Sequence, residues 1–298
     1  MKILVTGGSG FLGKHLVTKL SNIGFPVLAI SRNIPQNSDL VNVTWHRADL
    51  ACPNQYQEKI EQFAPEAVVC LSWQDIPDFS LKKSINNLEI TITLLDFVTN
   101  LKSCKKVLVS GSCLEYGKVK GSCQESESVF PSDYFTWAKC SIYTWLSMKC
   151  KKNNLSYAWF RIFYVYGPGQ RSGSLIPTIF RSLKASESCK IKSPKNANDF
   201  IYISDVIDAF YGALTKRFNS GIFNLGTGKS TQVLDIHELA ENIVNQSNYL
   251  TNELMSTCSQ EIADVDFWAS TSKTKQKLDW RAKVSILEGL QLTYELLQ

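Results

Sequence analysis

Long apolar runs are absent from this sequence. None of its uninterrupted hydrophobic stretches approaches the ~18–20 residues that a membrane-spanning helix needs. The first residues also lack the charged and then apolar order of a signal peptide, because glycines interrupt the apolar run after Val5. We therefore expect a cytoplasmic protein that does not contact a membrane.

Histidine is scarce, and the cysteines form no recognisable pairs. The three histidines, His15, His46 and His237, show no metal-ligand spacing, so we expect no metal site. Nine cysteines are an odd number without any Cys-x-x-Cys pair, and Cys70 and Cys140 lie in apolar or helical stretches. This pattern favours reduced thiols over a disulfide framework or a zinc site.

Concentrated charge of one sign is also lacking. The chain has 32 Lys and Arg residues against 27 Asp and Glu, a net charge of +5, and its basic residues are scattered. Short basic clusters at 105–106 and 149–152 are typical of solvated helix ends, so we expect no nucleic-acid partner. A hydrophobic content of 44% and a length of 298 residues suit one large α/β domain, or two closely joined ones.

The first informative motif in the sequence is a glycine-rich turn near the N-terminus. A short apolar run suited to a buried strand precedes Gly7, Gly10 and Gly13, and apolar residues at helical spacing follow. Gly7 permits the tight turn, Gly10 lets the backbone approach a pyrophosphate, and Gly13 lets the helix pack closely. This order predicts a dinucleotide site at the positive end of a helix whose first residues are Phe11 and Leu12.

The end of the second predicted strand bears on which dinucleotide binds. Residues 26–30 form another apolar run, which leads to Ser31, 18 residues after Gly13, and then to Arg32. In a doubly wound fold an acidic residue at this position binds the ribose 2′-hydroxyl of NAD. A hydroxyl and a guanidinium suit a 2′-phosphate instead, so the pair favours NADP. The alternative is an exposed loop arginine beside an NAD site.

The spacing Gly-x-x-Gly-x-x-Gly within Thr6–Gly13 resembles the extended short-chain dehydrogenase/reductase superfamily, whose members are NAD(P)-dependent sugar-nucleotide epimerases, dehydratases and reductases. Further segments resemble the same family in the same order, and together they cover nearly the whole chain. They are residues 106–117, 131–139, 157–170, 198–205 and 278–290.

The resemblance implies an α/β fold: a Rossmann-type doubly wound parallel sheet of about seven strands, with helices on both faces and a smaller C-terminal substrate-binding region. Residues 1–164, with 199–226 returning to them, would form the dinucleotide-binding domain. Residues 165–198 and 227–298 would form the substrate-binding region. Helices over 84–100 and 134–152 would pack in a homodimer, as they do in the family.

The resemblance also implies further cofactor contacts. Asp49, followed by Leu50, stands where the family contacts the adenine. The alternative for Asp49 is a helix cap before the segment that follows. Leu71, Ser72 and Trp73 end the next apolar run and resemble the strand end that lies under the cofactor.

The catalytic pattern of the family is present with one departure. Ser112, four residues before Tyr116, matches the catalytic Ser/Thr. Lys139 matches the lysine of Pro-x-x-x-Tyr-x-x-x-Lys, in which the tyrosine is the acid/base and the ammonium lowers its pKa from the same helix face. The residue four before Lys139 is Phe135, and Tyr134 is rotated roughly 140° from the required direction.

Another group must then deliver a proton to the developing alkoxide. We favour Ser112 with Lys139, through a water or directly, as the replacement. Tyr134 is the second choice, provided that its helix begins irregularly. Further candidates are Tyr143, Cys113 and Thr136.

Two substrate contacts of the family are replaced. The Asn that usually touches the substrate diphosphate is Tyr164 here, and the usual Arg is Asn198. Arg171, Lys192 and Lys195 are near in sequence and could substitute, with surface solvation the alternative for each lysine. The candidates for substrate binding are Ser112, Tyr164, Arg171 and Asn198.

These residues predict an NADP-dependent oxidoreductase that reduces a keto-sugar nucleotide, a small-molecule substrate. Alternatives within the family are an epimerase and a 4,6-dehydratase. The latter normally needs an Asp-Glu pair where Cys113 and Leu114 stand here, although Glu115 is near. An alternative from another class is a non-catalytic protein that senses a dinucleotide. The phenylalanine at 135 supports this alternative.

Overall fold

The largest element of the structure is a seven-stranded parallel sheet with the order β11-β7-β5-β4-β1-β2-β3. The structure is a computed structural model that describes residues 1–297 except 37–38, 119, 188, 190 and 258–262. The strands of the sheet are β1 Ile3–Thr6, β2 Val27–Ser31, β3 Val43–Arg47, β4 Ala67–Cys70, β5 Lys106–Ser112, β7 Ser156–Ile162 and β11 Gly221–Leu225. The predicted doubly wound α/β fold is confirmed.

The interior strand β1 is apolar over its first three residues because both of its faces are covered. Ile3 and Val5 contribute to one hydrophobic core, whereas Leu4 between them contributes to the other. All three side chains are fully buried. Alternate residues of one strand therefore hold the two helical layers to the same sheet.

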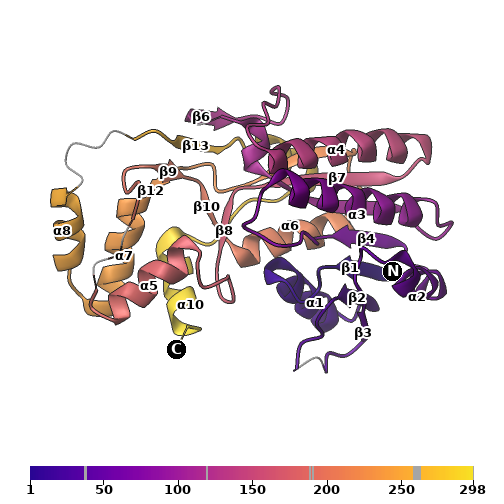
Figure 1. Ribbon diagram of the computed structural model, residues 1–298, viewed down its shortest axis with the longest axis horizontal. Helices are drawn as coiled ribbons and strands as arrows, with labels where there is room; N and C mark the ends of the chain where they lie inside the picture. The colour runs from indigo at the N-terminus through magenta and orange to yellow at the C-terminus, as the bar shows by residue number, and fades with distance from the viewer. Residues whose placement is uncertain (37–38, 119, 188, 190, 258–262, 298) are drawn as a thin grey trace.

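Helices cover both faces of the sheet (Figure 1). On one face lie α1 Phe11–Ile23 and α6 Ile203–Thr215, which pack against each other. On the other face lie α2 Gln57–Phe63, α3 Leu81–Thr99 and α4 Tyr134–Lys152. Two short 3₁₀ helices also occur: η1 Pro53–Gln55 comes before α2 in the chain, and η2 Cys113–Tyr116 comes directly after β5. The helix predicted over 134–152 has these bounds, and the one predicted over 84–100 begins three residues earlier.

A smaller region lies beside the sheet, and those of its helices that Figure 1 labels gather on the side away from α1–α4. It contains the parallel pair β8 Tyr164–Tyr166 and β10 Phe200–Tyr202, and a four-stranded sheet with the order β12-β9-β13-β6. The strands of this sheet are β6 Lys120–Cys123, β9 Ala197–Asn198, β12 Thr231–Gln232 and β13 Asp266–Ala269. The helices are α5 Leu175–Lys184, α7 Val233–Asn245, α8 Tyr249–Thr257, α9 Ser272–Leu278 and α10 Ile286–Glu295.

One buried carboxylate ties the smaller region together. Asp199, which is fully buried, accepts hydrogen bonds from the backbone N–H groups of Thr227, Gly228 and Ala269 at 2.7, 2.9 and 3.1 Å. These donors come from the loop after β11 and from β13. The carboxylate thereby fixes the neighbouring residue, Asn198, against two separate segments of the chain.

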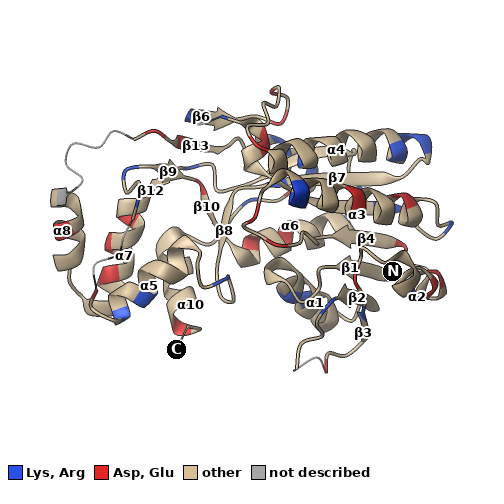
Figure 2. Cartoon of the chain, viewed as in Figure 1, with Lys and Arg blue, Asp and Glu red and all other residues tan. Residues whose placement is uncertain are grey.

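Charged side chains are spread over the elements of both regions, as Figure 2 shows. Lys149, Lys151 and Lys152 lie in the last turn of α4, where cations are favourable near the negative end of a helix. In the described part of the chain, none of the helices is both long enough and apolar enough to span a membrane.

Candidate active site

The glycine turn after β1 is tightly packed in the structure. Gly7 has a φ of +70°, and a Cβ on Gly13 would lie 2.0 Å from the carbonyl oxygen of Gly7. Helix α1 therefore begins directly over the turn. Only glycine at position 13 permits this close approach. Its N-cap, Gly10, forms no side-chain hydrogen bond to the first turn. The N–H groups at Phe11 and Leu12 are thus available to an anion at the positive end of the helix.

A cleft of about 190 Å³ opens beside this turn at the carboxyl ends of β1, β2 and β4. It is lined by most of the residues predicted to bind cofactor. These are Gly7, Gly10, Ser31, Arg32, Leu50, Leu71, Ser72 and Trp73, together with Ser9, Ile30, Asn33, Ala48 and Gln74. No carboxylate is among the described residues that line it, so the cleft suits an anionic ligand.

The Ser31 end of this cleft carries hydroxyl and guanidinium groups. The Ser31 hydroxyl is hydrogen-bonded to the Ser9 hydroxyl of the glycine turn. Arg47 on the adjacent strand β3 donates from Nε to the backbone oxygen of Arg32 at 3.1 Å. Two guanidinium groups therefore lie at the edge of the sheet where β2 ends at Ser31 and Arg32 follows.

Asp49 lies beside the cleft and bonds locally. Its Oδ1 accepts hydrogen bonds from the Ala51 N–H at 3.0 Å and from Gln74 Nε2 at 3.2 Å. Its neighbours Ala48 and Leu50 line the cleft, and Asp49 itself does not. The carboxylate does not cap the helix that follows, because the N-cap of η1 is Cys52. The adenine contact of Asp49 stays a prediction.

A second cavity, of about 370 Å³, continues from the first and shares Leu71 and Trp73 with it. Ser112, Lys139 and Phe135 line this cavity, and the predicted cofactor residue Leu12 also faces it. The other lining residues are mostly apolar: Ile76, Phe79, Ser110, Gly111, Cys113, Leu114, Ile162, Phe163, Tyr164 and Val165. The structure thus brings the two favoured catalytic residues into one apolar cavity that adjoins the dinucleotide cleft.

Lys139 is a buried cation, only 6% exposed. Its Nζ donates to the backbone oxygen of Ser110 at 2.9 Å and lies 4.3 Å from the centroid of the Trp73 ring. Burial lowers the pKa of Lys139 to about 8, because the charged form loses water, and the nearby Cys70 and Glu115 oppose this effect. An ammonium whose pKa lies near neutrality is suited to proton transfer.

Phe135 occupies the position that a phenol has in the family pattern. Its ring is 7% exposed and packs at 5.0 Å from the Trp73 ring and 4.5 Å from the Phe79 ring. Tyr134 is 52% exposed and does not line the cavity, because α4 is regular from its first residue. The structure therefore does not bring Tyr134 together with Ser112 and Lys139.

The three further candidates for the acid also differ in position. Tyr143 packs against Trp159 in the core beneath the sheet, with ring centroids 5.7 Å apart. Thr136 is buried at the start of α4, where its hydroxyl bonds Asp133. Cys113 lines the cavity, but burial raises the pKa of its thiol well above the ordinary value. Neither Tyr143 nor Thr136 lines the cavity.

Ser112 is held at the N-terminus of η2 by a reciprocal pair of hydrogen bonds. Its hydroxyl oxygen accepts from the Leu114 N–H at 3.2 Å, and its own N–H donates to Glu115 Oε1 at 2.8 Å. Because the hydroxyl oxygen already accepts a bond, its proton is oriented away from Leu114. Ser112 can therefore donate that proton to an oxygen of a bound ligand.

A buried ion pair supports this turn from below. Glu115 is fully buried and accepts from Arg161 Nε at 2.9 Å and from Trp159 Nε1 at 3.0 Å. Burial raises the pKa of Glu115, and the guanidinium of Arg161 opposes that rise. Sequence reasoning missed this pair, although an arginine inside the apolar stretch 157–163 was a usable signal.

A third cavity, of about 310 Å³, adjoins the second and shares Tyr164 and Val165 with it. Tyr164, Arg171 and Asn198 line it, so the structure brings together the three predicted substrate residues that are distinct from Ser112. Burial raises the pKa of the Tyr164 hydroxyl, which therefore stays protonated. Lys192 and Lys195 are not among the lining residues.

The fold and the cleft beside the glycine turn are those of the Rossmann-type dinucleotide-binding enzymes. A sequence model described as "NAD dependent epimerase/dehydratase family" matches residues 3–226. The chain therefore belongs to this family, as the resemblance to extended short-chain dehydrogenases/reductases implied.

Relatives and a solved structure are similar over nearly the whole chain. The chain is 25% identical to the dTDP-4-dehydro-6-deoxyglucose reductase of Escherichia coli, with 97% of this chain and 95% of the relative covered. It is 26% identical to the CDP-abequose synthase of Salmonella muenchen, over 97% and 96%. A UDP-glucose 4-epimerase structure with UDP-glucose, from Thermotoga maritima, is 25% identical with a TM-score of 0.84 and covers 100% of this chain and 98% of its own.

The burial of Lys139 predicts a specific pH dependence of stability. Its pKa is about 8 in the folded chain against 10.5 for an exposed lysine. Between these two values the unfolded chain binds a proton that the folded chain lacks, so stability rises with pH in this window. Relative to Lys139→Met, the wild type should gain about 2 kcal/mol between pH 8 and pH 10, measured by urea unfolding. A difference that stays constant with pH would show that Lys139 titrates normally.

Proposed function

We propose that this chain reduces a keto-sugar nucleotide with NADPH. The observation that carries the proposal is the continuity of the three cavities. The dinucleotide cleft meets the cavity of Ser112 and Lys139 at Leu71 and Trp73. That cavity in turn meets the third one at Tyr164 and Val165. A cofactor and an elongated substrate can thus approach one reacting point from opposite sides.

The residues of the first cleft fit a nicotinamide dinucleotide. The start of α1, where Gly10 provides no side-chain cap, would hold the pyrophosphate. Gly7 and Gly13 have no side chains, so the helix start packs directly on the turn. Ser31 and Arg32 would hold a 2′-phosphate, while Leu71 and Trp73 would guide the dinucleotide toward Lys139. When bound, the cofactor supplies the hydride for the reduction.

The second and third cavities would divide the substrate between them. The keto-sugar would lie in the apolar second cavity, beside Ser112 and Lys139. Its nucleotide would lie in the third cavity, where Arg171 is the cation among the described lining residues and Tyr164 and Asn198 offer uncharged polar groups. The reductase named for the Escherichia coli relative acts on a dehydro-sugar nucleotide by its name, which supports net reduction.

Two side chains would act on the carbonyl oxygen of the substrate, one as a hydrogen-bond donor and one as the proton source. The Ser112 hydroxyl donates a hydrogen bond to the sugar carbonyl oxygen, since its own oxygen already accepts from Leu114. As negative charge develops there, the ammonium of Lys139 provides the proton, through a water or directly. Phe135 has no proton to give. Its ring instead keeps water from the apolar side of Lys139, at 5.8 Å from Nζ.

The proposed reaction has a stoichiometric signature. Wild-type protein should oxidise one NADPH for each keto-sugar nucleotide consumed, which the loss of absorbance at the reduced nicotinamide band measures. An epimerase would instead leave the reduced cofactor unchanged at the end of the reaction.

Ser112→Ala should lower kcat by ~10²–10³, because a donor to the developing oxyanion is lost. Phe135→Tyr should raise kcat, because it adds a phenol, whereas Phe135→Leu should not. An unchanged rate in Phe135→Tyr would show that proton delivery does not limit turnover.

Arg32 predicts the choice between NADPH and NADH. Loss of a guanidinium bond to a 2′-phosphate should weaken NADPH binding by ~10–100-fold in Arg32→Ala. NADH lacks that phosphate, so its affinity should change little and serves as the internal control. Fluorescence titration of both cofactors measures the effect. Equal or tighter binding of NADH to the wild type, unaffected by the substitution, would contradict the preference.

The alternative reactions have less support in the site. A 4,6-dehydratase would need acidic groups where Cys113 and Leu114 stand, and Glu115 is held by Arg161 in the core. A dinucleotide sensor without chemistry is favoured by one observation, the phenylalanine ring in place of a phenol. Protein that binds NADPH and turns over no member of a broad keto-sugar panel would identify such a sensor.

We further propose that α3 and α4 form a homodimer interface. The two helices pack side by side, and Ile85 on α3 and Trp137 on α4 are 45% and 42% exposed. Wild-type protein should sediment as a dimer at micromolar concentration, and Trp137→Glu should sediment as a monomer, because a charge would be buried at the interface. Ile23→Glu on α1, where the side chain is 46% exposed, is the matched control and should remain dimeric. A monomeric wild type would contradict the interface.

A further inference from the structure

We propose that His15 is a positioning residue that holds one turn of the substrate cavity on the dinucleotide-binding helix. The turn comprises residues 167–170 and follows β8. The effect on substrate rests on the proposed function above, whereas the contact between His15 and the turn does not.

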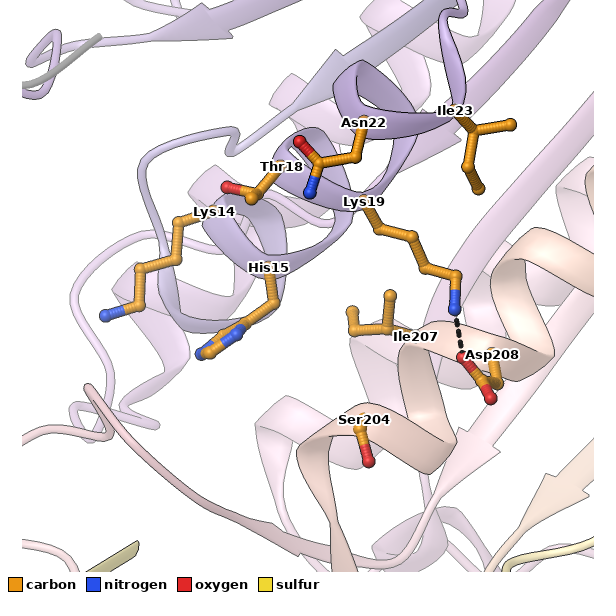
Figure 3. A pocket seen from close by; sticks show the side chains of 9 residues that line it. All are labelled: Lys14, His15, Thr18, Lys19, Asn22, Ile23, Ser204, Ile207 and Asp208. Atoms are coloured by element: carbon orange, nitrogen blue, oxygen red, sulfur yellow. Dashed lines mark hydrogen bonds and ion pairs between the residues drawn. The ribbon is translucent and has the colours of Figure 1, made fainter. Parts of the chain in front are cut away.

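His15 projects from α1 toward this turn, at the edge of a surface groove of about 570 Å³ between α1 and α6 (Figure 3). Its Nε2 lies 2.9 Å from the backbone oxygen of Pro168. A carbonyl oxygen can only accept, so Nε2 carries the proton and donates it. The imidazole also packs edge-on against the Phe11 ring, with centroids 6.0 Å apart, which fixes its direction.

The hydrogen bond that closes this turn does not use the Pro168 carbonyl oxygen. The Gln170 N–H donates to the Gly167 oxygen at 3.2 Å, which closes a four-residue turn. Proline at the second position and a glycine at the third, Gly169 with a φ of +78°, are typical of a type II turn. The Pro168 oxygen takes no part in the closing bond, and His15 supplies its donor.

The far side of this turn forms part of the third cavity. Gln170 and Arg171 both line that cavity, and Gln170 Nε2 donates to the Val165 oxygen at 3.0 Å. Arg171 donates from Nε to the Ser174 hydroxyl at 3.2 Å. A shift of the Pro168 carbonyl would therefore move two residues that line the third cavity, of which Arg171 is proposed to contact substrate.

The same helix carries the proposed pyrophosphate site. His15 is five residues after Gly10, so about 7.5 Å of helix separates the two positions. Loss of the His15 hydrogen bond should therefore loosen the turn without disturbing the glycines at the start of α1. The expected phenotype is weaker sugar-nucleotide binding with normal cofactor binding.

Two lysines flank His15 on α1 and have different partners. A Cβ on Gly169 would lie 1.6 Å from Lys14 Nζ, so the Lys14 ammonium packs against the same turn. Lys19 pairs with Asp208 of α6, as Figure 3 shows. Burial lowers the pKa of His15 below its usual value and Lys14 lowers it further, whereas the hydrogen bond to Pro168 opposes this shift. Protonation at Nδ1 would leave the Nε2 donor in place, and the contact is therefore not a pH switch.

Hydrogen exchange tests the contact in the protein alone. His15→Phe keeps a ring but removes the donor, His15→Gln keeps an N–H donor, and Thr18→Ala changes the same groove away from the turn. Amide exchange in peptides covering 167–174 should quicken by roughly 3–10-fold in His15→Phe, the equivalent of one lost hydrogen bond. His15→Gln and Thr18→Ala should exchange like the wild type. Unchanged exchange in His15→Phe would overturn the proposal.

Binding and kinetics test the consequence for substrate. In His15→Phe the Kd of UDP-glucose or dTDP-glucose, whichever the wild type binds, and the KM of the keto-sugar nucleotide should rise by roughly 3–10-fold. The Kd of NADPH and kcat should change less than about twofold, and His15→Gln should restore the wild-type KM. Equal losses in cofactor and sugar-nucleotide affinity would overturn the positioning role.

The two proposals fail in different ways. A wild-type protein that binds NADPH but neither sugar nucleotide would overturn the proposed function and the substrate part of this inference. The exchange experiment would still decide whether His15 holds the turn, because it needs no ligand.

Discussion

The buried carboxylate of Glu115 is the interaction on which the candidate site depends. It accepts hydrogen bonds from the end of β5 through the Ser112 N–H, and from β7 through Trp159 and Arg161. Removing one partner of such a buried pair typically costs 3–5 kcal/mol, roughly, because the other charge is left without compensation. The close approach also excludes any side chain at position 111, where a Cβ would lie 2.2 Å from Trp159 Nε1. The direction of the Ser112 hydroxyl is thus set by the core beneath it.

The main sheet could be predicted from the sequence because parallel strands are buried on both faces and must be apolar. The runs at 3–5, 26–30 and 67–71 stand out for that reason, and each coincides with a strand to within one residue. The pairing of β6 with β13 was not predicted. Its partners are 146 residues apart, and four-residue strands show too little periodicity to be recognised.

The site could be predicted in part. Spacing along a helix was enough to identify Phe135 as the residue on the face of Lys139, and to predict that Tyr134 points elsewhere when the helix is regular. Spacing could not reveal that Asp49 bonds Ala51 and Gln74, since local hydrogen bonds of loop carboxylates depend on the fold. The contact of His15 with the turn at 167–170 joins positions 153 residues apart, and only the packed chain reveals it.

A crystal structure of the protein with NADP⁺ and a sugar nucleotide would show which group donates the proton. We expect the Ser112 hydroxyl and the Lys139 ammonium to lie within ~2.6–3.2 Å of the reacting sugar oxygen, or to share one water with it. The Phe135 ring should remain between Trp73 and Phe79. A Tyr134 hydroxyl over the nicotinamide and beside Ser112 would contradict the account, because a displaced tyrosine would then be the acid.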